Sequence, residues 1–168
     1  MRQMVDDLLD YSSVGQGKEM VEVDCNKVLA EVIQDLEVVI EESNTTIDVA
    51  ELPKVKGFES ELRMLLQNLI SNSIKFGKPG VAPIINISAK EENGWIFSIQ
   101  DNGIGIEEHH LDKIFNVFQR LHTRNEIEGS GIGLAQCKKI IELHKGNIWI
   151  DSKLGEGSTF YFKIPNHK

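Results

Sequence analysis

The chain has 168 residues and a formal net charge of −8 at pH 7, with 26 acidic against 18 basic side chains. This length suits one domain with a short appendage, and 40% hydrophobic residues suffice for a packed core. The acidic balance argues against a nucleic-acid-binding face, and no apolar run approaches the roughly 20 residues that cross a bilayer. Cys25 and Cys137 stand too far apart for a CxxC motif, so two partly buried thiols are expected.

Apolar residues at helical spacing open the chain, in residues 1–12. A helix this short is marginal alone in water, so its apolar stripe needs a partner, either the domain behind it or another helix. Two glycines within residues 12–18 then indicate a linker. Asp24 is placed to cap the helix that follows it. The elements predicted for this half are a strand at 20–24, a helix at 26–42, a strand at 45–49 and an extended piece at 53–57.

A long helical pattern at 59–76 stops at Gly77. Alternating stretches at 84–90 and 95–101 predict a hairpin, because a Glu-Glu-Asn-Gly turn joins them. The later elements are a short helix at 111–118, a polar loop at 119–128, a helix at 133–144 and strands at 146–152 and 158–164. Together they predict an α+β fold, a two-layer sandwich in which a mixed, mainly antiparallel sheet of about five strands packs on about three helices.

The long helix at 59–76 carries a polar stripe beside its apolar face. At 100° per residue, Asn68, Asn72 and Lys75 fall on one side. Amide oxygens are neutral, hard ligands suited to Mg²⁺, and an ammonium group can meet phosphates. A solvated face would show the same pattern, so this stripe alone does not specify a site.

Asp101 follows the strand at 95–101 and opens the sequence Asp-Asn-Gly-Ile-Gly-Ile. A carboxylate accepts hydrogen bonds and donates none, so it would pair with the exocyclic amine of adenine and mismatch the carbonyl of guanine. Leaving that carbonyl unpaired costs on the order of 1–3 kcal/mol. Gly103 and Gly105 would let the backbone lie against a flat base. An ordinary Asp-Asn-Gly turn is the alternative.

The glycines at 129, 131 and 133 alternate at the start of the last predicted helix. Their exposed N–H groups and the helix N-terminus favour an anion. The pattern is not a dinucleotide fingerprint, because Leu134 and Gln136 stand where GxGxxG needs glycine, and the chain has no GxxxxGK[ST] loop. Upstream, Phe115 and Phe118 can anchor a mobile segment or face the core, and Arg120 offers a bidentate phosphate donor.

In order and spacing these four clusters resemble the N, F and G boxes of the GHKL ATP-binding superfamily, and most closely its sensor histidine kinases, over residues 20–165. Residues 1–14 resemble the end of the second helix of such a kinase's dimerization domain, with 15–19 as linker and 20–168 as the ATP-binding catalytic domain. The segment 118–124 is similar to kinases attached to phytochrome-type or PAS sensor modules. The resemblance implies the GHKL fold with Mg²⁺ and ATP or ADP as ligands.

The resemblance also implies residue roles: Asn72 as the Mg²⁺ ligand, Asn68 as the amide one turn earlier, and Lys75 and Arg120 as phosphate contacts. Asp101 would select adenine, and residues 116–130 would form a lid over ATP. The full set implied to bind ATP is Asn68, Asn72, Lys75, Phe76, Asp101, Gly103, Gly105, Ile106, Phe115, Arg120, Gly129, Ser130, Gly131, Ile132, Gly133 and Leu134.

Asn68 stands where the ATP-hydrolysing relatives carry a glutamate that activates water. An amide cannot take a proton from water or a hydroxyl, whereas a neutral imidazole is already a nucleophile, so Asn68 favours transfer to histidine. None of the chain's five histidines, at 109, 110, 122, 144 and 167, has the context of a phosphoacceptor; surface or lid positions are expected for them.

We therefore expect a truncated kinase that transfers the γ-phosphate to a histidine on an absent dimerization domain, for relay to a response-regulator aspartate. Nucleic acid and direct membrane contact are not expected, and the location is cytoplasmic, with a parent that is soluble or inner-membrane anchored. The alternatives are a nucleotide-sensing module without phosphotransfer and a GHKL-type ATPase or serine kinase.

Overall fold

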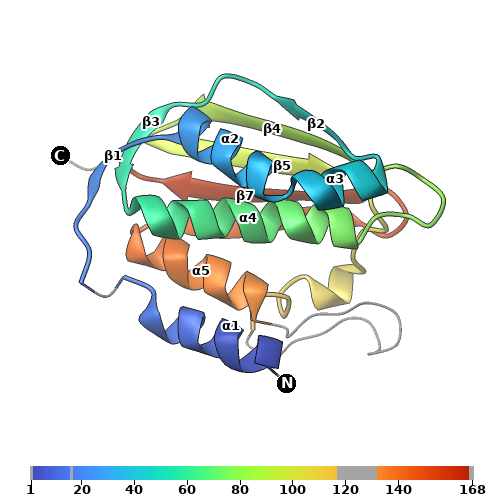
Figure 1. The fold of residues 1–168 in the computed structure, drawn as a ribbon, viewed down its shortest axis with the longest axis horizontal. Helices are drawn as coiled ribbons and strands as arrows, with labels where there is room; N and C mark the ends of the chain where they lie inside the picture. Colours follow the sequence, from blue (N-terminus) through green and yellow to red (C-terminus); the bar gives the residue numbers. More distant parts are fainter. Residues whose placement is uncertain (1, 16, 117–131, 167–168) are drawn as a thin grey trace.

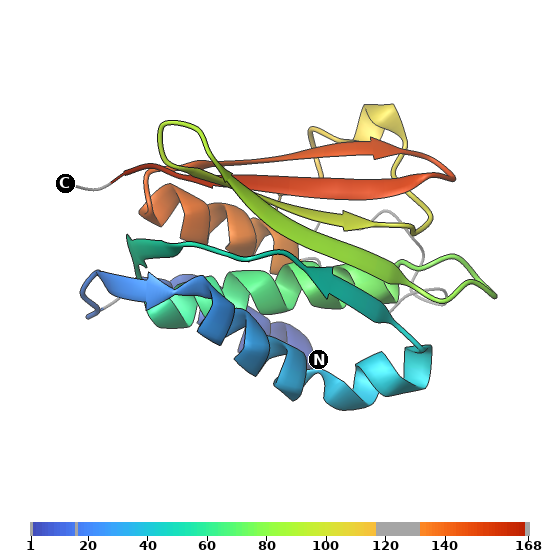
Figure 2. The same ribbon diagram turned by 90° about the horizontal axis from the view of Figure 1, so that it is seen from above.

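The computed structural model describes residues 2–15, 17–116 and 132–166. A five-stranded sheet forms one layer, and helices α2, α4 and α5 cover one of its faces (Figures 1 and 2). The predicted α+β two-layer sandwich is confirmed. The elements in chain order are α1 (Arg2–Ser13), β1 (Val21–Asp24), α2 (Cys25–Asp35), α3 (Glu37–Ser43), β2 (Thr46–Val49), β3 (Lys54–Gly57), α4 (Glu59–Lys75), β4 (Ile84–Glu91), β5 (Trp95–Asp101), the short 3₁₀ helix η1 (Glu108–His110), α5 (Gly133–Leu143), β6 (Asn147–Lys153) and β7 (Gly157–Ile164).

The sheet has the order β2-β4-β5-β7-β6, in which β2 runs parallel to β4 and all other neighbours are antiparallel. The predicted hairpin is present, with Glu91 opposite Trp95, and Asn93 and Gly94 take positive φ values of 51° and 120° in its turn. Alternate side chains of β4, β5 and β7 are buried, as a half-buried sheet requires. Asp101 closes β5 beside Ser158 of β7, at one end of the sheet.

Helix α4 lies between α2 and α5 over the sheet (Figure 1). Its buried leucines and isoleucines explain this central position, since each fully buried aliphatic side chain contributes about 1.5–3 kcal/mol. The residues concerned are Leu62, Leu65, Leu66, Leu69, Ile70 and Ile74. Cys25 and Cys137 are buried in the same core, and burial raises the pKa of both thiols to about 12.

The sequence predicted one helix at 26–42, but the structure divides it at Leu36 into α2 and α3. Leu36 leaves helical geometry, with φ −97° and ψ 10°, although its N–H still bonds to the carbonyl oxygen of Val32 at 3.0 Å. Helix α2 buries Val28, Leu29 and Val32, whereas no residue of α3 is buried. The break lets the chain turn away from the core and deliver β2 to the edge of the sheet. The predicted cap is confirmed, because the Asp24 carboxylate accepts the N–H of Asn26 at 3.0 Å.

The short helix predicted at 111–118 is wrong over the described residues. Residues 111–116 form turns after η1, held by i→i+3 hydrogen bonds such as Lys113 N–H to the carbonyl of His110 at 3.0 Å. Neighbouring residues Ile114 and Phe115 both pack against the core, and Phe115 meets Phe160 edge-on at 6.3 Å between ring centroids. Anchoring two adjacent side chains favours these tight turns over a regular helix.

Helix α1 lies beside α5 and away from the sheet (Figure 1). The Lys139 ammonium donates to the carbonyl oxygen of Tyr11 at 2.7 Å and lies 4.5 Å from the centre of its ring. Val5, Leu8 and Leu9 on the same helix are 56%, 45% and 61% exposed, so an apolar stripe remains uncovered. None of the helices in the described part of the chain is long and apolar enough to span a membrane.

Candidate functional site

The polar stripe of α4 faces the start of α5. Asn68 and Asn72 are half-buried and Lys75 is exposed. The Asn68 Nδ2 donates to Oε1 of Gln136 at 2.8 Å and makes a longer contact of 3.5 Å with the carbonyl oxygen of Gly133. The stripe is therefore not simply solvated, because one of its amides is tied to the helix that the sequence predicted as an anion site.

Asp101 is held at the end of β5 by backbone donors. Its Oδ1 accepts the N–H of Gly103 at 2.9 Å and the N–H of Ser158 at 3.2 Å. The hydroxyl of Ser73, the residue after Asn72, also hydrogen-bonds the carboxylate. Burial raises the pKa of Asp101 above its ordinary value, and these three hydrogen bonds oppose the rise by stabilising the ionised form. Both backbone bonds use Oδ1, so neither backbone donor occupies Oδ2.

Backbone packing accounts for the glycines around Asp101. A Cβ on Gly103 would lie 2.4 Å from the carbonyl oxygen of Phe76, which also accepts the N–H of Ile104 at 3.0 Å. Gly105 has φ +73°, and a Cβ there would lie 2.1 Å from the carbonyl oxygen of Lys153. The sequence had assigned both glycines to the approach of a flat base. In the structure they let the Asp101 loop dock on the end of α4 and on β6.

Of the other residues predicted to bind ATP, some lie in the described part of the chain and some lie outside it. The Ile106 N–H bonds to the Ser152 hydroxyl at 2.8 Å, and Ile106 and Phe115 pack beside the core. Ile132 is fully buried, and Gly133 and Leu134 open α5. A Cβ on Gly133 would lie 3.7 Å from Oδ1 of Asn68, so the first residue of α5 adjoins the α4 stripe. Four members lie outside the described residues: Arg120, Gly129, Ser130 and Gly131.

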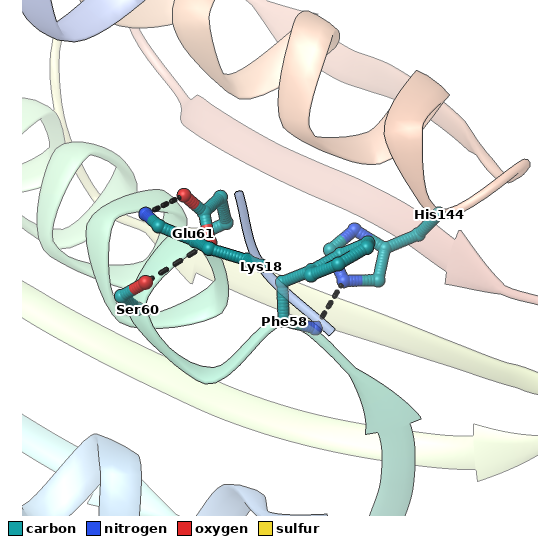
Figure 3. A network of polar contacts seen from close by, with 5 residues as sticks. All are labelled: Lys18, Phe58, Ser60, Glu61 and His144. Atoms are coloured by element: carbon teal, nitrogen blue, oxygen red, sulfur yellow. Dashed lines mark hydrogen bonds and ion pairs between the residues drawn. The ribbon is translucent and has the colours of Figure 1, made fainter. Parts of the chain in front are cut away.

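The histidines do not all occupy the expected surface positions. His144, at the end of α5, is fully buried: its Nε2 accepts the N–H of Phe58 at 3.0 Å, and its Nδ1 lies 2.7 Å from the carbonyl oxygen of Ile140 (Figure 3). The expectation was wrong because the imidazole satisfies two backbone groups between α5 and the start of α4. His109 is exposed and His110 half-buried, in η1, whereas the histidines at 122 and 167 fall outside the described residues.

The same end of α4 holds a buried ion pair. Glu61 is 1% exposed and accepts hydrogen bonds from the Lys18 ammonium and, at 3.0 Å, from the Ser60 hydroxyl (Figure 3). Burial opposes ionisation of Glu61, but the hydrogen bonds from Lys18 and Ser60 outweigh it and hold the pKa of Glu61 below its ordinary value. This network joins the linker to the start of α4, whereas Asp101 approaches the last turns of that helix.

The chemistry of Asn68, Asn72, Asp101 and the start of α5 suits a metal-bound nucleotide. Asn68 and Asn72 stand one turn apart on α4, where two neutral amide oxygens suit a hydrated Mg²⁺ ion. The N-cap residue of α5 is Ile132, whose apolar side chain makes no capping hydrogen bond, and the helix begins beside Asn68, so its first N–H groups suit an anion. Asp101 offers a fixed acceptor oxygen beside the end of the same helix α4. The fit to magnesium therefore rests on the chemistry of these ligands.

Sequence reasoning missed three contributors. Ser73 and the N–H of Ser158 hold Asp101, and Gln136 holds Asn68. Ser73 follows a predicted ligand and could have been suspected from its place on the helix. The other two contacts join residues 57 and 68 positions apart, which no local pattern reveals.

Comparisons with known proteins agree with the sequence resemblance. The model of the family described as "Histidine kinase-, DNA gyrase B-, and HSP90-like ATPase" matches residues 57–168. The phytochrome-like protein Cph1 of Synechocystis sp. is 45% identical over 166 residues, which cover 98% of this chain and 22% of Cph1. The chain thus spans about a fifth of the length of that relative.

Solved structures of histidine kinases share the fold. The nucleotide-free catalytic domain of ThkA superposes with a TM-score of 0.75 at 29% identity, covering 89% of this chain and 97% of the ThkA domain. Full-length ShkA in complex with AMPPNP gives a TM-score of 0.80 at 26% identity, covering 96% of this chain and 35% of ShkA. ThkA in complex with the response regulator TrrA gives 0.76 at 27% identity, covering 99% and 47%.

Proposed function

The chain belongs to the histidine kinase-, DNA gyrase B- and HSP90-like ATPase family, as a catalytic domain of the histidine kinase type, and from this premise we propose that it binds Mg·ATP and donates the γ-phosphate to a histidine on a separate helical domain. The observation that carries the proposal is the fixed carboxylate of Asp101. It is held by the backbone of its own loop and of β7, next to the helix that bears Asn68 and Asn72.

Asp101 would recognise the nucleotide base. Its Oδ1 is occupied by the N–H groups of Gly103 and Ser158, which leaves Oδ2 to accept the exocyclic amine of adenine. Guanine would place a carbonyl oxygen against that acceptor, and neither group could donate. This selection for adenine is consistent with ShkA, which has been solved with AMPPNP.

The phosphates and the metal would lie between α4 and the start of α5. Asn72 would hold Mg²⁺, with Asn68 one turn earlier, and Lys75 would contact the phosphates together with Arg120 and the glycines at 129, 131 and 133. A bound magnesium ion supplies charge neutralisation between phosphate groups. The protein's own residues orient the triphosphate and shield it from water, so the proposed catalysis rests on positioning rather than on a covalent intermediate.

The acceptor would be an imidazole rather than water or a serine. Asn68 is an amide and cannot serve as a general base. A neutral imidazole already carries a lone pair and needs no such base, so transfer to histidine suits this site better than hydrolysis. We infer that hydrolysis by the chain alone is slow.

The domain assignment and the partners follow as parts of the proposal. Residues 1–14 would belong to a dimerization helix, which fits the uncovered apolar stripe of α1, residues 15–19 would be the linker, and 20–168 the catalytic domain. A receiver domain would accept the phosphoryl group from the histidine, and the complex of ThkA with the response regulator TrrA supports a partner of this kind. The proposed location is the cytoplasm.

The test uses ATP labelled in the γ-phosphate and a separately purified helical domain that carries the phosphoacceptor histidine of a histidine kinase. We expect no label on the chain itself, label on the added domain, and loss of that label with Asn72→Ala. A chain that labels its own histidines would contradict the proposed acceptor. Rapid hydrolysis without the added domain would favour an ATPase, and nucleotide binding without any transfer would favour a sensing module.

A further inference from the structure

Gln136 of α5 makes an unusual contact for a core position. It is 5% exposed and lies between Ala135 and Cys137, which are 4% and 0% exposed. Its Oε1 accepts a hydrogen bond from Asn68, whereas its Nε2 is buried and has no hydrogen-bond partner within the described part of the chain. A buried donor without a partner costs about 1–3 kcal/mol. An apolar side chain of similar size would avoid that cost, so stability alone does not explain the amide.

Two oxygens beside Asn68 favour one orientation of its amide: Oε1 of Gln136 and the carbonyl oxygen of Gly133, of which the second belongs to the backbone and cannot turn. An asparagine can turn its amide group and exchange the places of oxygen and nitrogen, and its partners decide between the two orientations. The carbonyl oxygens of Gln136 and Gly133 both lie on the side of Nδ2, at 2.8 Å and 3.5 Å. Oδ1 then lies towards Gly133, the first residue of α5, where an added Cβ would be 3.7 Å from it. Asn68 thus presents an acceptor at the place where the phosphates are proposed to bind.

We propose, as an inference that rests on the proposed function, that Gln136 is a positioning residue. It holds the Asn68 side chain so that the amide oxygen of Asn68 points towards the reacting groups. In this orientation Asn68 accepts a hydrogen bond, either from a metal-bound water or from the N–H of the incoming imidazole, and cannot donate to a phosphate oxygen. The unpartnered Nε2 is the cost of placing an acceptor at this point of the core.

Gln136→Met separates this role from a structural one. Methionine has a similar length and removes both the acceptor and the buried unpartnered donor, so the melting temperature should stay the same or rise. Without the Gln136 acceptor the Asn68 amide keeps only its longer contact with the Gly133 carbonyl and its hydrogen bond with Cys137, so its orientation is held less firmly. Phosphotransfer at saturating ATP should then fall about tenfold while ATP affinity changes less than about twofold. A merely structural role predicts a lower melting temperature and no separation of rate from affinity.

A double-mutant cycle tests whether Gln136 acts through Asn68. We expect Gln136→Met to lower the transfer rate in the wild-type background and to have no further effect in the Asn68→Ala background, because the group that it positions is then missing. Lys138→Met makes the same kind of change on the exposed side of α5 and should leave the rate unchanged. The side-chain amide signals of Asn68 in the NMR spectrum should shift with Gln136→Met and stay unchanged with Lys138→Met.

The possible failures are distinguishable. If the wild-type chain transfers no phosphate to the added histidine domain, the proposed function fails, and the positioning role fails with it. If the wild type transfers phosphate and Gln136→Met does so at the same rate, the positioning role alone is overturned. A tenfold loss that persists in the Asn68→Ala background, or one that accompanies a lower melting temperature, would also overturn it.

Discussion

At Asp101 the backbone determines which atoms of the side chain can face a ligand. The two N–H groups of Gly103 and Ser158 both use Oδ1, and only an oxygen can occupy that position. The identity of the other side-chain atom is then free to vary between oxygen in aspartate and nitrogen in asparagine. Nucleotide selectivity should depend on that one atom.

Asp101→Asn should therefore reverse the preference for the purine. The amide oxygen of the variant must face the two backbone N–H groups, which places its NH₂ group where Oδ2 stood. That donor suits the carbonyl of guanine and repels the amine of adenine, so the ratio of ATP to GTP affinity should fall at least about tenfold. Calorimetry with both nucleotides measures the ratio. An unchanged ratio would show that another residue reads the base.

The binding of ATP should weaken on mild acidification. Burial raises the pKa of Asp101, so its carboxylate becomes protonated at a higher pH than an ordinary aspartate, and the protonated form is the poorer acceptor. For stability the sign is the reverse: the cost of burying the ionised group is present at neutral pH and disappears as the pH falls through this raised pKa. ATP affinity measured at falling pH should therefore fall more steeply for the wild type than for Asp101→Asn. The variant serves as the control, because protonation of the nucleotide affects both proteins equally.

At the scale of elements, α4 connects two different polar networks, one at each of its ends. Its first turn holds the Lys18–Glu61 pair and joins the linker, and its last turns carry Asn72, Ser73 and the carbonyl of Phe76 beside the Asp101 loop. The apolar face between them is buried against the sheet. A rigid helix of this kind keeps the linker end and the nucleotide end in a fixed relation, so the linker pair contributes mainly to stability.

Lys18→Met should destabilise the fold by about 1.5–3 kcal/mol, the range for a hydrogen bond to a charged group. The variant leaves the Glu61 carboxylate buried without its cation, while Lys18 itself is 40% exposed. The contribution of ionised Glu61 to wild-type stability is present above the pKa of the unfolded chain and is lost as the pH falls through the lowered pKa of the folded state. In the variant, Glu61 becomes easier to protonate, so the deficit should be greatest at neutral pH and shrink towards acid. Urea unfolding at several pH values measures it.

Two controls isolate this pair. Adding Glu61→Gln to Lys18→Met should recover most of the lost stability, because the buried charge is then gone. Lys153→Met breaks an exposed pair with Glu156, in which the charged atoms are 3.8 Å apart, and should change the free energy of unfolding by less than about 0.5 kcal/mol. Equal losses from the two lysine variants would mean that burial of Glu61 does not matter.

At the scale of the whole molecule, the site exists only where the two layers meet. The sheet contributes the end of β5 and the start of β7, and the helical layer contributes α4 and the first turn of α5 (Figure 2). A ligand that bridges these elements binds the folded state and not the unfolded chain, so it must stabilise the molecule as a whole.

Mg·ATP should raise the melting temperature of the chain, and removal of the metal should diminish the effect. At 100 times the dissociation constant the linkage is about 2.7 kcal/mol, which corresponds to about 5–10 °C for a domain of this size. We expect a smaller shift with ATP and a chelator, and little shift with GTP. Asn72→Ala should respond to ATP equally with and without magnesium. A metal-independent shift in the wild type would contradict the role of Asn72.

Sequence periodicity by itself determined the elements with a strong local pattern. The alternation of β4, β5 and β7, the apolar face of α4 and the cap at Asp24 follow from interactions within a few residues, so they were predictable. The order of the motifs also identified the family, and it placed Asp101 and Asn68 in the site as predictions. In the structure Asn68 adjoins the start of α5 and Asp101 lies beside the last turns of α4, whereas Gly105, Ile106 and Phe115 pack against β6 and β7.

Only the tertiary structure decided the remaining features. The break at Leu36, the pairing of β1 with β3 and the turns after η1 depend on where the core and the sheet edge lie. Gly103 must be glycine because the carbonyl of Phe76 leaves no room for a Cβ, and this too depends on the tertiary structure. So does the hydrogen bond between Asn68 and Gln136. Such contacts join residues that are distant in the chain, and the free energy that favours them appears only when the layers pack together. A local pattern in the sequence therefore cannot predict these contacts.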